Sequence, residues 1–145
     1  MLMEGSFRIP SDIEKVWDFV SEPSKIIECV PGLQSFTVGD NKRISATVKV
    51  AIGFIRGNFQ ATSKVVKEDH ASHTATLELA GSGAGSGFAA AVDIGITPAG
   101  AESDLAWKAD VRISGPLGSL AKPLLEGNVK KIVSQLFDCV KSKLS

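Results

Sequence analysis

The sequence predicts a single α+β domain in which a curved antiparallel sheet surrounds a long C-terminal helix. Across residues 44–113, apolar and polar residues alternate, which is typical of strands with one dry and one wet face. Across residues 117–144, apolar residues recur instead at helical spacing. The chain has 145 residues, which is enough for one domain over 1–145 and too few for two ordinary ones.

The N-terminal part predicts one strand and two short helices. Residues 3–9 indicate a strand that ends at Pro10, because proline has no backbone N–H to donate to a sheet. Ser11 and Glu14 match a capping box, so the first helix is expected to begin at Ser11. Pro23 suits the first turn of a second helix.

The middle of the chain predicts about six consecutive strands. Alternation is strict in residues 44–50 and returns in the segments 55–65, 76–79, 88–96 and 104–113. Strands joined by short turns form an antiparallel sheet with one wet face and one dry face. The dry face needs a cover, and only the final helix is long enough to supply it.

The dry face combines large and small residues, which leaves two interpretations open. Either the sheet and helix enclose a ligand cavity lined by apolar side chains, or the interior is fully packed. If there is a cavity, the sequence predicts that it is lined by Val48, Phe59, Leu77, Leu79, Phe88, Val92, Trp107, Val111, Leu120, Leu124 and Val133.

A glycine-rich segment at residues 81–87 resembles a phosphate-binding loop only superficially. Ser86 stands where a third glycine would complete the G-x-G-x-x-G pattern, and a strand rather than a helix follows. A hairpin joint or bulge is the favoured interpretation. A further interpretation makes Gly83, Gly85 and Gly87 the rim of a pocket mouth.

No residue pattern predicts a catalytic or metal centre. His70 and His73, with Asp69, form the nearest approach to a metal site. They lie in a predicted turn without a further ligand nearby in the sequence, so surface histidines are expected and no metal is predicted. The chain contains no tyrosine, and no histidine can be paired with either cysteine from sequence.

The two cysteines, Cys29 and Cys139, are too few for a disulfide scaffold and are expected to be free, buried thiols. The N-terminal residues lack the features of a secretory signal, and the most apolar stretch, 87–96, is too short to span a bilayer. A reducing cytoplasm is therefore expected.

The net charge of the chain bears on which partners it can bind. Sixteen basic residues balance sixteen acidic ones, which argues against nucleic-acid binding. A basic surface facing a membrane is an alternative use of the helix lysines, which more often simply face solvent.

Several segments together resemble CoxG, a family of carbon monoxide dehydrogenase subunits. They are residues 29–32 (CVPG), 46–53 (ATVKVAIG), 55–59 (IRGNF), 81–89 (GSGAGSGFA), 125–128 (LEGN) and 135–137 (QLF). The family belongs to the START/Bet v 1-like (SRPBCC) superfamily. The likeness covers nearly the whole chain in motif order.

The resemblance implies a helix-grip fold: a seven-stranded antiparallel sheet, two short helices and a long C-terminal helix around an apolar cavity. It also implies an accessory role beside molybdenum-containing carbon monoxide dehydrogenases or related hydroxylases, with links to membrane recruitment and quinone binding. The family offers no catalytic residues to transfer. No apolar tail follows the final helix in this sequence, so peripheral contact with the inner face of a membrane is expected rather than an anchor.

The leading hypothesis is a non-catalytic carrier that binds an apolar small molecule, a quinone or lipid, and uses no other cofactor. One alternative is a docking subunit of a redox enzyme with a packed interior and no ligand. Another is a cyclase- or hydrolase-like enzyme on the same fold.

Overall fold

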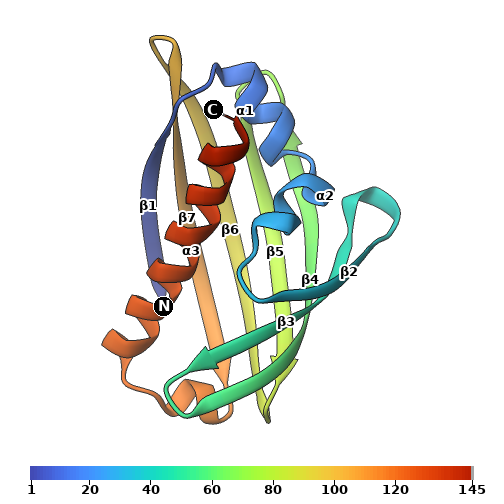
Figure 1. Cartoon of the computed structure of the whole chain (residues 1–145), viewed down its shortest axis with the longest axis vertical. Coiled ribbons are helices and arrows are strands. Elements are labelled where there is room, and N and C mark those ends of the chain that lie inside the picture. Colours follow the sequence, from blue (N-terminus) through green and yellow to red (C-terminus); the bar gives the residue numbers. More distant parts are fainter. Residues whose placement is uncertain (145) are drawn as a thin grey trace.

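The computed structural model describes residues 1–144 and confirms the predicted fold class. Seven antiparallel strands form one sheet in the order β1-β7-β6-β5-β4-β3-β2 (Figure 1). The strands are β1 (Leu2–Ile9), β2 (Leu33–Val38), β3 (Ile44–Ile52), β4 (Ile55–Asp69), β5 (Thr74–Gly83), β6 (Ser86–Ala99) and β7 (Glu102–Ser114). Five of the six neighbouring pairs are consecutive in sequence; β1 closes the sheet by pairing with β7.

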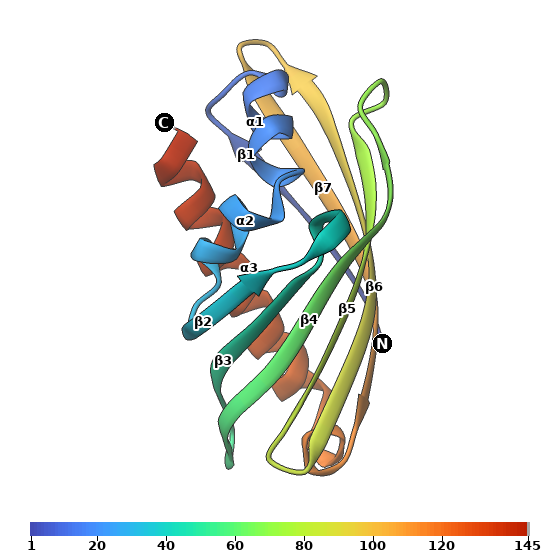
Figure 2. The same cartoon turned by 90° about the vertical axis from the view of Figure 1, so that its right-hand side faces the viewer.

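The helices all lie on the concave side of the sheet (Figure 2). They are α1 (Ile13–Val20), α2 (Pro23–Ile26) and the long α3 (Lys122–Leu144), with short 3₁₀ turns η1 (Ile27–Cys29), η2 (Asp40–Lys42) and η3 (Pro116–Ser119). α3 runs along the interior and lies closest to β1 and η1. The sheet therefore grips one long helix, as the alternation predicts.

Two predicted helix boundaries are wrong. The last helix begins at Lys122 and not at Leu117, because η3 occupies residues 116–119 first. The first helix begins at Ile13 and not at Ser11, and the predicted capping box of Ser11 and Glu14 is not formed. Asp12 is the N-cap of α1 instead, and its Oδ1 accepts a hydrogen bond of 3.1 Å from the Lys15 amide. Ser11 is instead buried, and its carbonyl oxygen accepts a 2.8 Å hydrogen bond from Ser103 Oγ.

The apolar core is divided into two clusters. The larger cluster joins α1, η1, β1, β6, β7 and the C-terminal half of α3, and includes Trp17, Leu105, Trp107, Phe137 and Val140. The smaller cluster joins the β3–β4 turn to η3 and the start of α3. It consists of Ile52, Ile55, Phe59, Leu117 and Leu125. The two clusters therefore hold the two halves of α3 separately.

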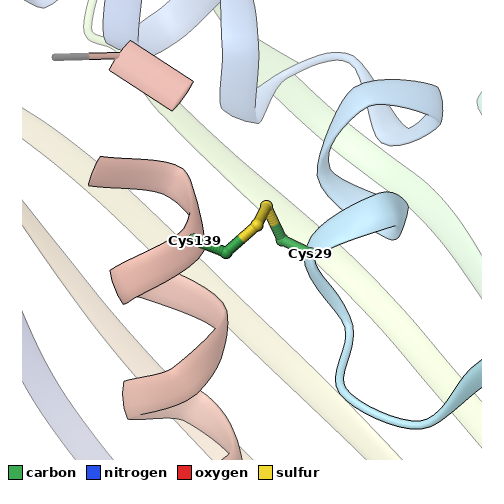
Figure 3. The surroundings of a disulfide bond; sticks show 2 residues. All are labelled: Cys29 and Cys139. Carbon is green, nitrogen blue, oxygen red and sulfur yellow. A yellow bond between two sulfur atoms is a disulfide. The ribbon is translucent and has the colours of Figure 1, made fainter. Parts of the chain in front are cut away.

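Cys29 and Cys139 form a disulfide (Figure 3), so the expectation of free thiols is wrong. Their Cα atoms are 5.5 Å apart, within the usual range for a disulfide, although 110 positions separate them in sequence. The bond joins η1 to the last turns of α3. Because disulfides persist mainly in oxidising compartments, the cysteines no longer support a cytoplasmic location.

Two glycines give a matched test of the packing. A Cβ added at Gly5 would come within 2.9–3.1 Å of the Trp107 indole, whereas one added at Gly127, inside α3, would meet nothing within 4 Å. We expect Gly5→Ala to lower the free energy of unfolding by about 1–3 kcal/mol through overpacking. Gly127→Ala is expected to raise it by about 0.5–1 kcal/mol through helix propensity. Urea denaturation measures both, and equal effects would contradict the packing described.

Candidate functional site

The inner face of the sheet is the first candidate site, because part of it is not covered. Between the two core clusters, inward-facing side chains of the central strands are only half-buried and belong to neither cluster. Strand register places them on the same face as Phe59 and Trp107. This band consists of Val48, Ala61, Ser63, Val65, Leu77, Leu79 and Ala90, and is called the inner band below.

The total accessible surface is somewhat larger than that of an average compact monomer. The chain exposes 7875 Å² at a mass of 15.2 kDa. A compact monomer of this mass is expected to expose about 7,100 Å². The half-buried inner band is one place where such additional surface lies.

The residues predicted to line a cavity fall into four groups. Phe59 is part of the smaller cluster and Trp107 of the larger one. Val92, Val111 and Val133 pack against the larger cluster, and Phe88 and Leu120 against the smaller. Val48, Leu77 and Leu79 lie in the inner band. Leu124 is 41% exposed on the first turn of α3. Their role in ligand binding stays a prediction.

The glycine-rich segment forms the β5–β6 hairpin turn and leaves room for aromatic rings on the inner face. Ala84 and Gly85 form the β5–β6 turn with positive φ angles of 49° and 75°. Gly81 lies beneath the ring of Phe88, and a Cβ at Gly83 would come within 2.8 Å of the Phe59 ring. The hairpin interpretation is therefore confirmed, and the glycines also make room for two aromatic rings. The rim role of Gly83, Gly85 and Gly87 stays a prediction.

Trp107 carries an unpartnered polar atom. Its Nε1–H is buried and has no hydrogen-bond acceptor among the described residues. Gly5 of β1 lies close to this atom, since a Cβ there would come within 2.9 Å of Nε1. Because the indole lies against β1 and belongs to the larger core cluster, we assign it to packing.

Ionisable side chains are scarce at the inward-facing positions of the described strands. Glu68 occupies such a position near the end of β4, where it forms an ion pair of 3.0 Å with Lys42. The hydroxyl side chains at inward positions are Ser63, Ser86 and Ser103, and Ser86 Oγ accepts a 2.8 Å hydrogen bond from the Leu117 amide. Ser103 is fully buried and donates its hydroxyl to the Ser11 carbonyl. An acid–base pair cannot be assembled from the side chains of the inner band.

Two depressions lie on the opposite, outer face of the sheet. One, of about 510 Å³, is lined by charged residues that include Lys64, Glu78, Asp110 and Arg112. The other, of about 750 Å³, includes Glu4, Asp93 and Lys108. Charges of both signs in these open depressions are poorly suited to an apolar ligand.

A second candidate lies where α1 meets the turn between β4 and β5. Glu14 Oε2 lies 2.8 Å from His70 Nε2, and its Oε1 lies 2.8 Å from His73 Nε2. The hydrogen bond with His70, followed by that with His73, lowers the pKa of Glu14. The same carboxylate raises the pKa of His70.

The sequence predicted only part of this cluster of Glu14, His70 and His73. His70 is exposed as expected, whereas the side chain of His73 is only 17% exposed. Asp69, grouped with them by proximity, instead caps the turn by accepting hydrogen bonds from the Ala71 amide and the Ser72 hydroxyl. Glu14 was missed because it precedes His70 by 56 positions and was assigned to the capping box.

The described residues, 1–144, include no helix that is both long and apolar enough to cross a bilayer.

Comparisons with known proteins extend these observations. The family model for CoxG, a carbon monoxide dehydrogenase subunit, matches residues 5–145. The comparison with curated proteins finds no significant match.

Solved structures show the same fold at low identity. A conserved protein from Geobacillus kaustophilus has a TM-score of 0.91 at 20% identity, covering 99% of this chain and 95% of its own. A START superfamily protein from Mycobacterium smegmatis has a TM-score of 0.72 at 12% identity, covering 99% and 96%. Norcoclaurine synthase from Thalictrum flavum has a TM-score of 0.63 at 15% identity, covering 97% and 92%. The chain therefore has a START/Bet v 1-like fold, which hosts both binding proteins and enzymes.

Proposed function

Because the chain belongs to the CoxG family of carbon monoxide dehydrogenase subunits, we propose that it is a non-catalytic accessory protein that carries an apolar small molecule, a quinone or lipid. The ligand would lie between the central strands and α3. The partner would be a molybdenum-containing carbon monoxide dehydrogenase or a related hydroxylase. The family name supports this association, and the fold is one that typically binds apolar ligands.

The observation that carries the proposal is the half-buried inner band between two separate core clusters. An apolar ligand placed there would gain roughly 25 cal/mol per Å² of buried surface, before the cost of ordering it. Phe88 is the best-placed aromatic ring, because it is half-buried whereas Phe59 and Trp107 are already enclosed in the core. The inner band itself contains no ionisable side chain, which favours binding over catalysis.

Peripheral contact with a membrane surface is part of this proposal. Phe54, in the β3–β4 turn, is 72% exposed. A Cβ at neighbouring Gly53 would lie 3.4 Å from Leu124 and 3.6 Å from Leu120. Exposed apolar residues thus gather where α3 begins, at the end opposite to its disulfide. This end suits the transfer of a lipid-soluble ligand to and from a bilayer.

The experiment uses two adjacent alanines on opposite faces of β6. Ala90 faces inward between Leu79 and Val111, whereas Ala89 faces outward. Purified protein is extracted with organic solvent for mass spectrometry. It is then titrated with a menaquinone analogue in lipid vesicles, followed by tryptophan fluorescence and vesicle co-sedimentation. We expect Ala90→Phe to weaken saturable binding at least 10-fold with little loss of stability, and Ala89→Phe to leave binding unchanged.

The docking alternative predicts the opposite pattern. In a fully packed interior, Ala90→Phe would destabilise the chain by about 1–3 kcal/mol, and no apolar molecule would be extracted or bound. That result would overturn the carrier proposal and favour a docking subunit. Binding that is equally sensitive to both substitutions would place the ligand elsewhere.

A further inference from the structure

We propose that Glu14, His70 and His73 form a binding site for a divalent transition-metal ion of the zinc class. This inference is independent of the carrier function, because these side chains lie outside the inner band. Their ligand atoms, one carboxylate oxygen and two imidazole nitrogens, all lie within 4.8 Å of one another. Two ligands of a tetrahedral Zn²⁺ ion, each about 2.1 Å from it, are about 3.4 Å apart. Small side-chain rotations at this surface therefore suffice to converge on one ion.

The turn between β4 and β5 is built to hold both histidines on the same side. The His73 amide donates to the His70 carbonyl at 3.3 Å, and His73 has a positive φ of 54°. The His73 carbonyl in turn accepts a 3.0 Å hydrogen bond from the Ile96 amide, which fixes the end of the turn on β6. Asp69 caps the turn from within. The backbone thus fixes the Cα positions from which the two imidazoles extend before any ion binds.

Trp17 packs against both histidine rings of the site. The indole is buried and stacks on the His70 ring with centroids 5.9 Å apart. It meets the His73 ring edge-on at 5.7 Å. Trp17 follows Glu14 by three positions on α1, so both side chains lie on the same face of this helix. The helix therefore supplies both a carboxylate ligand and an aromatic support for the two imidazoles.

The set of donors determines the class of ion. Imidazole nitrogen suits Zn²⁺, Cu²⁺ and Ni²⁺, and these ions bind nitrogen and oxygen sites more tightly than Mn²⁺ or Fe²⁺. Two histidines and one glutamate provide three ligands, which leaves the remaining position to water. An ion here would replace two hydrogen bonds by three coordination bonds that connect α1 to the β4–β5 turn.

The chain is well suited to a direct test, because its only two histidines are both in this cluster and both cysteines are in the disulfide. Tag-free protein is titrated with Zn²⁺ by calorimetry. We expect one ion per chain, with affinity that falls as the pH is lowered because protons compete for the imidazoles. Zn²⁺ should also raise the Tm reversibly, since it binds the folded state.

Variants separate this site from adventitious binding. Glu14→Gln should weaken Zn²⁺ binding at least 10-fold, and His70→Ala with His73→Ala should abolish it. His70→Ala alone is a safe variant for folding, since this side chain is 65% exposed, and should also weaken binding at least 10-fold. Glu28→Gln removes a carboxylate from η1, away from the cluster, and should leave the affinity unchanged.

Ni²⁺ gives a second, spatial readout. Bound Ni²⁺ should quench the adjacent Trp17, and Trp17→Phe should lose this quenching while still binding Zn²⁺. The proposal is overturned if Zn²⁺ gives no saturable binding and no rise in Tm, which would leave the cluster as a hydrogen-bonded ion pair. It is equally overturned if the double histidine variant binds Zn²⁺ as the wild type does.

Discussion

Replacing both cysteines, as Cys29→Ala with Cys139→Ala, is expected to lower the free energy of unfolding by about 3–5 kcal/mol. The bond closes a loop across 110 positions, and the chain-entropy model gives about 4.7 kcal/mol for a loop of 100 residues at 25 °C. Urea denaturation of the double variant and the oxidised wild type measures the difference. Wild-type protein treated with reductant should approach the variant, which separates loss of the bond from loss of the sulfur atoms.

The same experiment contains its own check. The stability of the double variant should not change with reductant, since it has no other cysteine. Titration of two free thiols in unreduced, unfolded wild-type protein would contradict the disulfide directly. So would equal stability of wild type and variant under oxidising conditions.

Phe59→Ala should have a comparably large effect, with a loss of about 3–5 kcal/mol, because a buried aromatic ring is removed from the smaller core cluster. Phe59 is only 2% exposed, and its ring lies against Gly83. Leu79 lies on the same face but in the half-buried inner band. Leu79→Ala should therefore cost only about 1 kcal/mol.

This pair of variants tests the open interior without any ligand. In both thermal and urea unfolding, the Phe59→Ala variant should be far less stable than the Leu79→Ala variant. If Leu79→Ala instead cost about 2–5 kcal/mol, as in a well-packed core, the inner band would have to be filled. The carrier proposal would then lose its main support.

The sheet could be predicted from sequence because its signal is local and repeated. Alternation over residues 44–113 identifies which side chains share a face, and the register of β3 to β7 follows from short hairpins. The final helix was equally clear from its spacing. Its start was not, because η3 also buries an apolar residue, Leu117, and so continues the same hydrophobic pattern.

The other errors involve contacts between distant segments. Glu14 fits a capping box locally, but two histidines more than 50 positions away interact with its carboxylate, and Asp12 takes the cap. The disulfide likewise depends on how α3 lies against η1, which no local pattern encodes. The reason for glycine at positions 81 and 83 is steric. The rings of Phe88 and Phe59 lie where a Cβ at these positions would be.

The position of the disulfide also bears on how a guest molecule would enter and leave. A covalent bond at Cys139 fixes the C-terminal end of α3 to η1, so this end cannot separate from the rest of the fold. The opposite end is held without a covalent bond, by side-chain packing of Leu117 and Leu125 beside the β3–β4 turn and by a 2.8 Å hydrogen bond that the Leu117 amide donates to Ser86 Oγ. Any outward swing of α3 must therefore pivot about the sulfur bridge and open at residues 116–125. The rate at which a ligand enters and leaves would then depend on the packing of η3. Reduction of the disulfide would free the C-terminal end of α3 but would not change the site of opening at residues 116–125.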